Sequence, residues 1–322
     1  MRECEIFALQ GMKGIGNAAI STLIQYLTDL DAKTLLEIDF DVLVREPNLS
    51  RYKKALTDNL DKLSFELAIA QSEKEIESLR ARGIKVISLT NQHYPQSLKL
   101  IKNPPPLLFC RGNTGLLSQD RNIAIIGTRN NTPLGKAIAA KTTNYFASSG
   151  FVIVSGLALG IDTIVHEECL SCNGKTIAVL VDVDNVQPAK NRDLVNSILF
   201  QNGLLISENA PGIKITPSLF IKRDRIQAGL SLAVFTIETS KDGGTMHAVN
   251  AAKQEHRLIY VPDYTKSGYQ DKSIEQISGI ISLYSDPEVE AYTKASYPQI
   301  IERLNIKEND IFSVDKAQGT LL

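Results

Sequence analysis

From residue 122 onward, short apolar runs alternate with stretches of helical periodicity. The runs read IAIIG, FVIVSG, TIAVLV, LLISE, AVFTIE and LIYVP in chain order. They are almost continuously apolar, which is typical of parallel strands buried on both faces of a sheet, and the stretches between them supply the covering helices. The pattern predicts a doubly wound, mostly parallel α/β sheet, in which ligands bind beyond the carboxyl ends of the strands.

The first 110 or so residues are different, with helical periodicity and few strand-like runs. Within them, LQGMKGIGNAAISTLIQYL has the outline of a helix-hairpin-helix, because Gly14 and Gly16 allow a tight turn that exposes backbone N–H groups. Such a turn can hold a nucleic-acid phosphate, although a plain helical turn explains this single copy equally well.

Prolines mark the boundary between these two regions. Pro95 and the proline run at 104–106 cannot lie inside a helix, so the joint falls in HYPQSLKLIKNPPPLLFCRGN. We expect a small helical N-terminal domain with its linker at 1–110, a sheet domain at 111–285 and a C-terminal helical tail at 286–322.

Composition narrows the function classes. The net charge is −1, so any nucleic-acid binding has to come from a local basic patch. No apolar run approaches the roughly 18 residues of a membrane span, and the first residues lack the features of a signal peptide, so we expect a cytoplasmic protein without membrane contact. Cys169 and Cys172 form a C-x-x-C without further ligands at zinc spacing, which favours reduced, buried thiols over a metal site.

The loops after the predicted strands carry the candidate chemistry. They are rich in Gly, Ser and Thr, and several lead directly into a helix, where unsatisfied N–H groups attract a phosphate or another anion. The candidate phosphate-binding residues in these loops are Gly127, Thr128, Ser155, Gly156, Gly160, Gly243, Gly244 and Thr245.

Cations are the second element of this site. Arg129 stands where the dinucleotide fingerprint G-x-G-x-x-G has its second glycine, and its side chain would crowd a bound dinucleotide, so we expect no cofactor. Instead, a long cation after a buried strand needs an anion or an acceptor. Further cations, each of which could equally be a solvated surface charge, are Lys190, Arg192, Lys222, Arg223 and Arg225.

The sequence offers no catalytic residues. A nucleophile elbow, an H-E-x-x-H motif and a Walker A lysine are all missing. His166 follows Asp162 by four residues, which favours a hydrogen bond between them over a metal pair because no third ligand is evident. Glu238, at the end of a strand, fits a structural acceptor better than a base. We therefore expect a binding protein and not an enzyme.

Seven segments together resemble the DNA-processing protein A family, also called Smf. They occur in the family's order and spacing over about residues 90–265, and the linker with Tyr-Pro and Pro-Pro-x-Leu is similar to the family's as well. The segments are IAIIGTRNNTPLGKAIA, FVIVSGLALGIDTIVH, GKTIAVL, QPAKNRDLV, LLISENAPG, FIKRDRIQAGLS and GGTMHAVNAA.

The resemblance implies an extended Rossmann-like domain that binds single-stranded DNA, forms a homodimer and helps to load the RecA recombinase during natural transformation. It also implies that the arginine of the G-[ST]-R motif, here Arg129, contacts a DNA phosphate. Further phosphate contacts carried over from the family are Ser155, Gly156, Lys222, Arg223 and Arg225.

The chain departs from the family pattern at three places. Asp224 stands where the family usually has asparagine, which puts a carboxylate beside the proposed phosphate path, and Leu159 replaces a residue that is often basic. The residues after VPDYTKSG are too few for the winged-helix domain of some members, so we expect none. These changes predict a thinner DNA footprint.

The competing hypothesis is a nucleotide-binding enzyme or sensor on a related Rossmann-like fold, similar to the nucleoside-monophosphate phosphoribohydrolases. That chemistry requires a glutamate three residues after the threonine of the Gly-rich loop. This position holds Ala248 here, so the carboxylate that such an enzyme needs is missing.

Overall fold

The computed structural model describes residues 1–266 and 274–318, and the chain divides into two compact units. The first comprises Met1–Tyr94 and Lys102–Arg111, and the second comprises Pro95–Ile101 and the chain from Gly112 onward. Among the described residues, no helix is long and apolar enough to cross a membrane.

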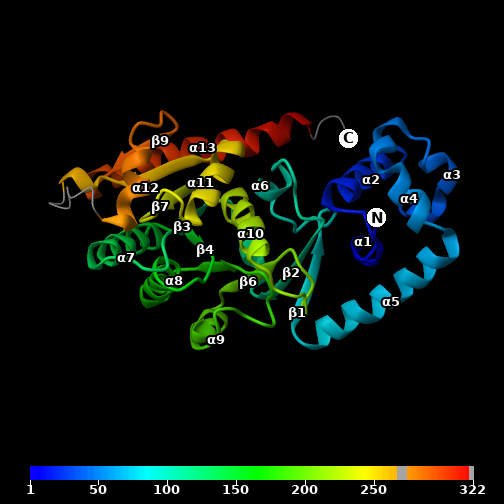
Figure 1. The fold of residues 1–322 in the computed structure, drawn as a ribbon, viewed down its shortest axis with the longest axis horizontal. Helices are drawn as coiled ribbons and strands as arrows, with labels where there is room; N and C mark the ends of the chain where they lie inside the picture. Colours follow the sequence, from blue (N-terminus) through cyan, green and yellow to red (C-terminus); the bar gives the residue numbers. More distant parts are fainter. Residues whose placement is uncertain (267–273, 319–322) are drawn as a thin grey trace. The chain divides into compact units, whose positions relative to one another are not determined.

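The first unit is mostly helical but also contains a strand pair (Figure 1). Strand β1 (Ile84–Ser88) pairs in antiparallel fashion with β2 (Leu107–Gly112), in a region for which we expect few strands. Between α1 and α2, Gly14 has a φ of 82°, as a tight turn requires, while a phosphate-binding role for this turn stays a prediction. The helices of this unit are α1 (Glu3–Gln10), α2 (Asn17–Asp29), α3 (Phe40–Leu43), α4 (Lys53–Asn59) and α5 (Lys62–Ala81).

The second unit confirms the predicted α/β class. Its strands lie in the order β6-β5-β4-β3-β7-β8-β9, and each neighbouring pair is parallel. The strands are β3 (Asn122–Ile126), β4 (Val152–Ser155), β5 (Thr176–Val179), β6 (Leu204–Ser207), β7 (Ala233–Thr236), β8 (Leu258–Pro262) and β9 (Val289–Tyr292).

Helices cover both faces of this sheet. Buried residues of α7, α8 and α13 form one core cluster with alternate residues of the central strands, such as Ile123 and Phe235. The intervening residues, such as Ala124 and Val234, are buried too, and α10 and α11 pack against the same strands. The helices of this unit are α6 (Gln96–Lys99), α7 (Pro133–Ser148), α8 (Ile161–Ser171), α9 (Arg192–Phe200), α10 (Pro217–Leu230), α11 (Thr245–Gln254), α12 (Glu275–Leu283) and α13 (Tyr297–Gln318).

The expected C-terminal tail is instead part of the second unit. Its first residues form β9, which pairs with β8 in the register Tyr260↔Glu290, and not the start of a terminal helix. Tyr292 is buried with its hydroxyl 3.0 Å from that of Thr142, and Leu304 of α13 lies in the core cluster. The sequence did not indicate this strand because β9 is an edge strand whose side chains are only partly buried, so it contains polar residues.

The strand order creates a topological switch point. From β3 the chain builds outward through β4, β5 and β6, and it then returns to the other side of β3 with β7, β8 and β9. The loops after β3 and β7 therefore run apart, and a crevice opens beyond the carboxyl ends of these two strands.

Candidate nucleic-acid interface

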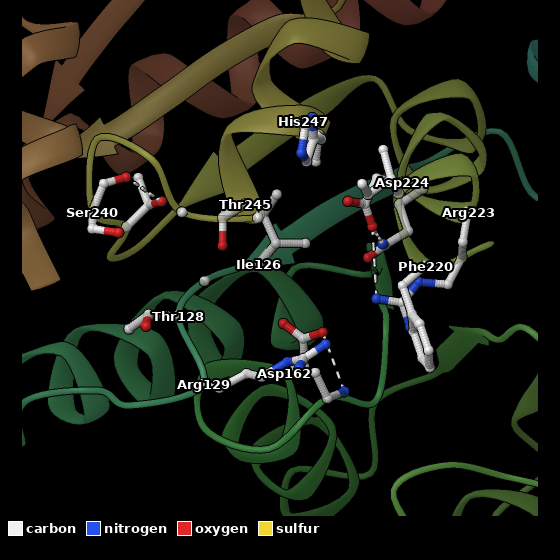
Figure 2. Close-up of a pocket in the computed structure, with 18 of the residues that line it drawn as sticks. Ile126, Thr128, Arg129, Asp162, Phe220, Arg223, Asp224, Ser240, Thr245 and His247 are labelled. Carbon is white, nitrogen blue, oxygen red and sulfur yellow. Dashed lines mark hydrogen bonds and ion pairs between the residues drawn. The ribbon is translucent and has the colours of Figure 1, made fainter. Parts of the chain in front are cut away.

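A pocket of about 550 Å³ occupies this crevice. Figure 2 shows its walls: the loop after β3 with Thr128 and Arg129, the region after β7 with Ser240 and Thr245, and helix α10 with Phe220 and Asp224. The pocket thus unites two of the strand-end loops that the sequence pattern selects with the cationic segment on α10.

The loop after β3 is held by backbone contacts. Thr128 donates its N–H to the carbonyl of Glu238 at 2.8 Å, and its own carbonyl accepts the N–H of Ile161 at 3.2 Å. Gly160 has a φ of 82°, and a Cβ there would lie 2.5 Å from the Thr128 oxygen and 2.6 Å from the Arg129 oxygen. Gly160 is therefore needed for the close approach of two loops.

Glu238 fixes the same loop from below, which confirms its interpretation as a structural acceptor. Its buried carboxylate accepts hydrogen bonds from the Thr132 N–H at 2.9 Å and the Thr132 hydroxyl at 2.5 Å, where α7 begins. Burial raises the pKa of Glu238, while these donors act against the rise.

With its backbone fixed, Arg129 extends an exposed side chain at the edge of the pocket. Its guanidinium carbon lies 5.9 Å from the ring centroid of half-buried Phe220 on α10. Both residues also line a neighbouring pocket of about 640 Å³, which includes Lys214. An exposed cation beside an aromatic ring therefore stands where the two pockets meet.

Arg223 does not lie on the surface, and the expectation that it contacts a phosphate is corrected here. It is 8% exposed, and its Nη1 donates to the carbonyls of Gly156 at 2.5 Å and Val179 at 3.3 Å. Its Nη2 lies 3.6 Å from Asp224 Oδ1. The reason is helical phase, since Arg223 lies on the same face of α10 as buried Ile226.

Two carboxyl groups flank this buried guanidinium. Asp162 Oδ2 accepts the N–H groups of Gly156 at 3.2 Å and Ala158 at 3.3 Å. Burial raises its pKa, against the effect of Arg223. For Asp224, burial raises the pKa to about 7; Arg223 opposes this rise, and the charge of Asp162 adds to it. The floor of the pocket is therefore acidic, with one carboxyl group that titrates near neutrality.

Gln227 completes the floor. Its side chain is 2% exposed, and its Nε2 donates to Asp224 Oδ1 at 3.0 Å. Its Oε1 is buried without a hydrogen-bond partner among the residues that the structure describes. Because Gln227 also lines the pocket, a ligand with a donor group could satisfy this oxygen.

The opposite wall is the start of α11. Gly243, Gly244, Thr245 and His247 line it, as the sequence predicts for the first three. Gly244, the N-cap residue, has no side chain that could accept a hydrogen bond from the first turn. The N–H groups of Met246 and His247 donate to the carbonyls of Gly243 and Gly244 at 3.0 Å each. The partial positive charge of the helix end faces the pocket.

Other predicted site residues lie elsewhere. Ser155 is fully buried and donates its hydroxyl to the Ile125 carbonyl at 2.8 Å, so its predicted phosphate contact is corrected. Arg225 pairs with Glu208, whereas Lys190 and Lys222 are exposed and line neither pocket. Gly127 and Thr128 line the first pocket, and Gly156 packs against Arg223, where a Cβ would lie 2.5 Å from Nη2.

The expected hydrogen bond between Asp162 and His166 is wrong. His166 Nδ1 lies 2.8 Å from the Thr176 hydroxyl, while Asp162 turns to backbone amides. Burial lowers the pKa of His166 to about 3. In the part of the chain that the structure describes, no three His, Cys, Asp or Glu side chains are grouped to hold a metal ion.

Among the residues of the two pockets that sequence reasoning missed are Phe220, Gln227, Lys214 and His247. Two spacings in the sequence could have indicated Gln227. It lies three residues after Asp224 and four residues after Arg223, which places the three side chains close together on one helix.

Comparison with known proteins identifies the family. The sequence profile of the DNA recombination-mediator protein A family matches residues 85–281, more than half of the chain. The DNA processing protein DprA of Bacillus subtilis is 33% identical over 217 residues, which cover 66% of this chain and 73% of that protein. DprA of Streptococcus pneumoniae is 30% identical over 272 residues, which cover 83% and 89% of the two chains.

Solved structures agree with the sequences. The X-ray structure of DprA from Streptococcus pneumoniae has a TM-score of 0.73 and 25% identity, covering 91% of this chain and 95% of that one. DNA processing protein A from Helicobacter pylori, whose structure concerns its single-stranded DNA binding mode, has a TM-score of 0.59 and 27% identity, covering 68% and 96%. This chain belongs to the DNA recombination-mediator protein A family.

Proposed function

We propose that this protein binds single-stranded DNA at the mouth of the two pockets, as a cytoplasmic factor that handles single strands in natural transformation and recombination. Binding protects the incoming strand and brings it to the RecA recombinase. The family supports the DNA-processing role, and the Helicobacter pylori relative supports the single-stranded form of the ligand.

The observation that carries the proposal is the pair of Arg129 and Phe220 at the meeting point of the pockets. Proteins that bind single strands without reading their sequence combine cations, which hold the phosphates, with aromatic rings, on which the bases stack. A duplex keeps its bases stacked on one another and cannot use the ring in this way.

The charge distribution supports a backbone path along the mouth of the pocket. Arg129 and Lys214 provide positive charge there, and Lys190 and Lys222 add exposed positive charge on the same unit. Asp162 and Asp224 flank Arg223, so the floor is unfavourable for a phosphate when both carboxyl groups are ionised, because their charge then exceeds that of the guanidinium. The strand therefore places its phosphates outward and a base inward.

An enzymatic role has less support. Ala248 lines the pocket at the position where the nucleotide-cleaving enzymes of the competing hypothesis need a glutamate. Its methyl group can neither donate nor accept a proton. We infer that the pocket binds a strand and performs no chemistry on it.

The test is a binding titration with a fluorescent single-stranded oligonucleotide at several salt concentrations. Arg129→Gln should weaken binding about tenfold and reduce the slope of log K against log salt by about 0.7, the value for one phosphate contact on a single strand. Phe220→Ala should weaken binding with an unchanged slope, because stacking on the ring involves no counterion.

The matched control is Lys175→Gln, which removes one exposed positive charge at the amino end of β5, whereas the pocket lies beyond the carboxyl ends of the strands. It should leave affinity and slope unchanged. Equal effects of Arg129→Gln and Lys175→Gln would contradict a localised site.

A further inference from the structure

A single buried residue, Glu238, contacts the loop that carries Arg129 at both of its ends. The backbone carbonyl of Glu238 accepts the N–H of Thr128 at 2.8 Å, on one side of Arg129. Its carboxylate accepts the N–H of Thr132 at 2.9 Å and the hydroxyl of Thr132 at 2.5 Å, on the other side. Glu238 is fully buried, and neither Glu238 nor Thr132 lines either of the two pockets. Glu238 therefore acts on the loop and not on a ligand in the pockets.

The carboxylate of Glu238 also lies against the start of α7. A Cβ on Gly135, in the first turn of this helix, would lie 2.2 Å from the carboxyl carbon and 2.4 Å from each carboxyl oxygen. Thr132 is the N-cap of α7, and its hydroxyl oxygen accepts the N–H of Gly135 at 3.0 Å while its proton points to Glu238. A negative charge is favourable at this end of a helix. One carboxylate thus fixes both the loop and the helix that follows it.

The start of this helix is where dinucleotide-binding folds hold a phosphate. In those folds the pyrophosphate lies at the N-terminus of the helix that follows the strand with the glycine fingerprint. Thr132 stands at the third glycine position of that fingerprint, as Arg129 stands at the second. Glu238 reaches this helix end from the neighbouring strand β7, so the chain supplies its own anion there.

Resting on the proposed function, we propose that Glu238 is a positioning residue for DNA binding. It is an internal anion that takes the place of a nucleotide phosphate at the start of α7 and holds the loop so that Arg129 meets a phosphate of the strand. Among the described residues, the side-chain contacts of Glu238 are all donors, from Thr132 and from the Tyr264 hydroxyl at 3.4 Å. A side chain without acceptors would leave the donors of Thr132 unpaired and release the loop.

A double-mutant cycle with Arg129→Gln tests this role. Glu238→Met keeps an unbranched side chain of similar length but removes both acceptor oxygens. Its affinity for a fluorescent oligodeoxythymidine of about 20 residues should fall about five- to tenfold, and the slope of log K against log salt should fall by about 0.7, as for Arg129→Gln. The double variant should bind no more weakly than Arg129→Gln alone, because Glu238 acts through Arg129. Glu238→Gln keeps one acceptor oxygen for Thr132 and should retain most of the affinity.

Thr132→Val and Thr132→Ser form a second pair, which decides the question if Glu238→Met does not fold. Thr132 is half-buried; the valine removes its hydroxyl and should weaken binding with a reduced salt slope, whereas the serine keeps the hydroxyl and should restore both. A Glu238→Met protein that melts earlier but binds with unchanged affinity and slope would overturn the proposal, as would effects that multiply in the double variant. A wild type that does not bind single-stranded DNA would instead overturn the proposed function.

Discussion

Replacement of Arg223 by methionine tests whether this residue stabilises the fold or binds DNA. The change keeps a long side chain but removes the donors to Gly156 and Val179 and the charge beside Asp224. Loss of one partner of a buried ion pair costs about 3–5 kcal/mol. We expect a fall of about 3 kcal/mol in the free energy of unfolding, near the lower limit, because the carboxyl groups can take up protons.

The pH dependence of this loss follows from the carboxyl groups. Asp224 has a pKa of about 7 in the folded protein against 3.8 as its ordinary value, so it favours the folded state below about pH 4 and loses this contribution as the pH rises through 7. Without Arg223 its pKa rises further. The deficit of the variant should therefore be smaller at pH 5.5 than at pH 8.

Urea denaturation followed by circular dichroism at both pH values measures this effect. Lys222→Met is the control, because Lys222 is the exposed neighbour on the same helix, and it should change stability by no more than about 0.5 kcal/mol. A stable Arg223→Met protein with weakened DNA binding would show that Arg223 serves the ligand, and our account of the floor would be wrong.

Three further outcomes are expected. The affinity for single-stranded DNA should fall as the pH rises from 6 to 8, because ionised Asp224 repels phosphate despite Arg223 and Arg129. Asp224→Asn should flatten this profile in binding curves followed by fluorescence anisotropy, with His247→Gln as the control for the histidine that lines the same pocket. Gly160→Ala should lower thermal stability by about 1–3 kcal/mol and weaken DNA binding, because its Cβ would displace the loop that carries Arg129. Light scattering at micromolar concentration should show a homodimer, which the resemblance to the family implies, and a monomer would count against this expectation.

The fold could be predicted because its signal is local. Each near-continuous apolar run of the second unit became a parallel strand, such as IAII in β3 and AVFT in β7. The strand β9 escaped prediction because VEAY lacks a continuous apolar run and is only partly buried, so its pairing depends on an available edge of β8 and not on its own composition.

The candidate site was only partly predictable from the sequence. Arg129 could be placed because it follows a buried strand in a loop at the carboxyl end of the sheet, whereas the direction of Arg223 depends on the phase of α10. Its buried residues Arg223, Ile226, Gln227 and Leu230 follow spacings of three, one and three, which is one face of a helix. Lys222 lies one position off this face and is exposed. The helical periodicity therefore indicated that Arg223 is buried, but the surrounding cationic residues suggested an exposed basic patch instead.

If the proposed function holds, the charges of the pocket favour a strand of DNA over a free phosphate. A small phosphate ion would be attracted to exposed Arg129. On moving inward it would meet Asp162 and Asp224, whose combined charge, when both are ionised, exceeds that of Arg223 between them. A strand avoids this conflict because its charge and its base are separated by the sugar. It can hold its phosphate at Arg129 while its neutral base enters past Phe220. We therefore expect the carboxyl groups of the floor to weaken the binding of a free phosphate more than that of a strand, without any increase in net positive charge.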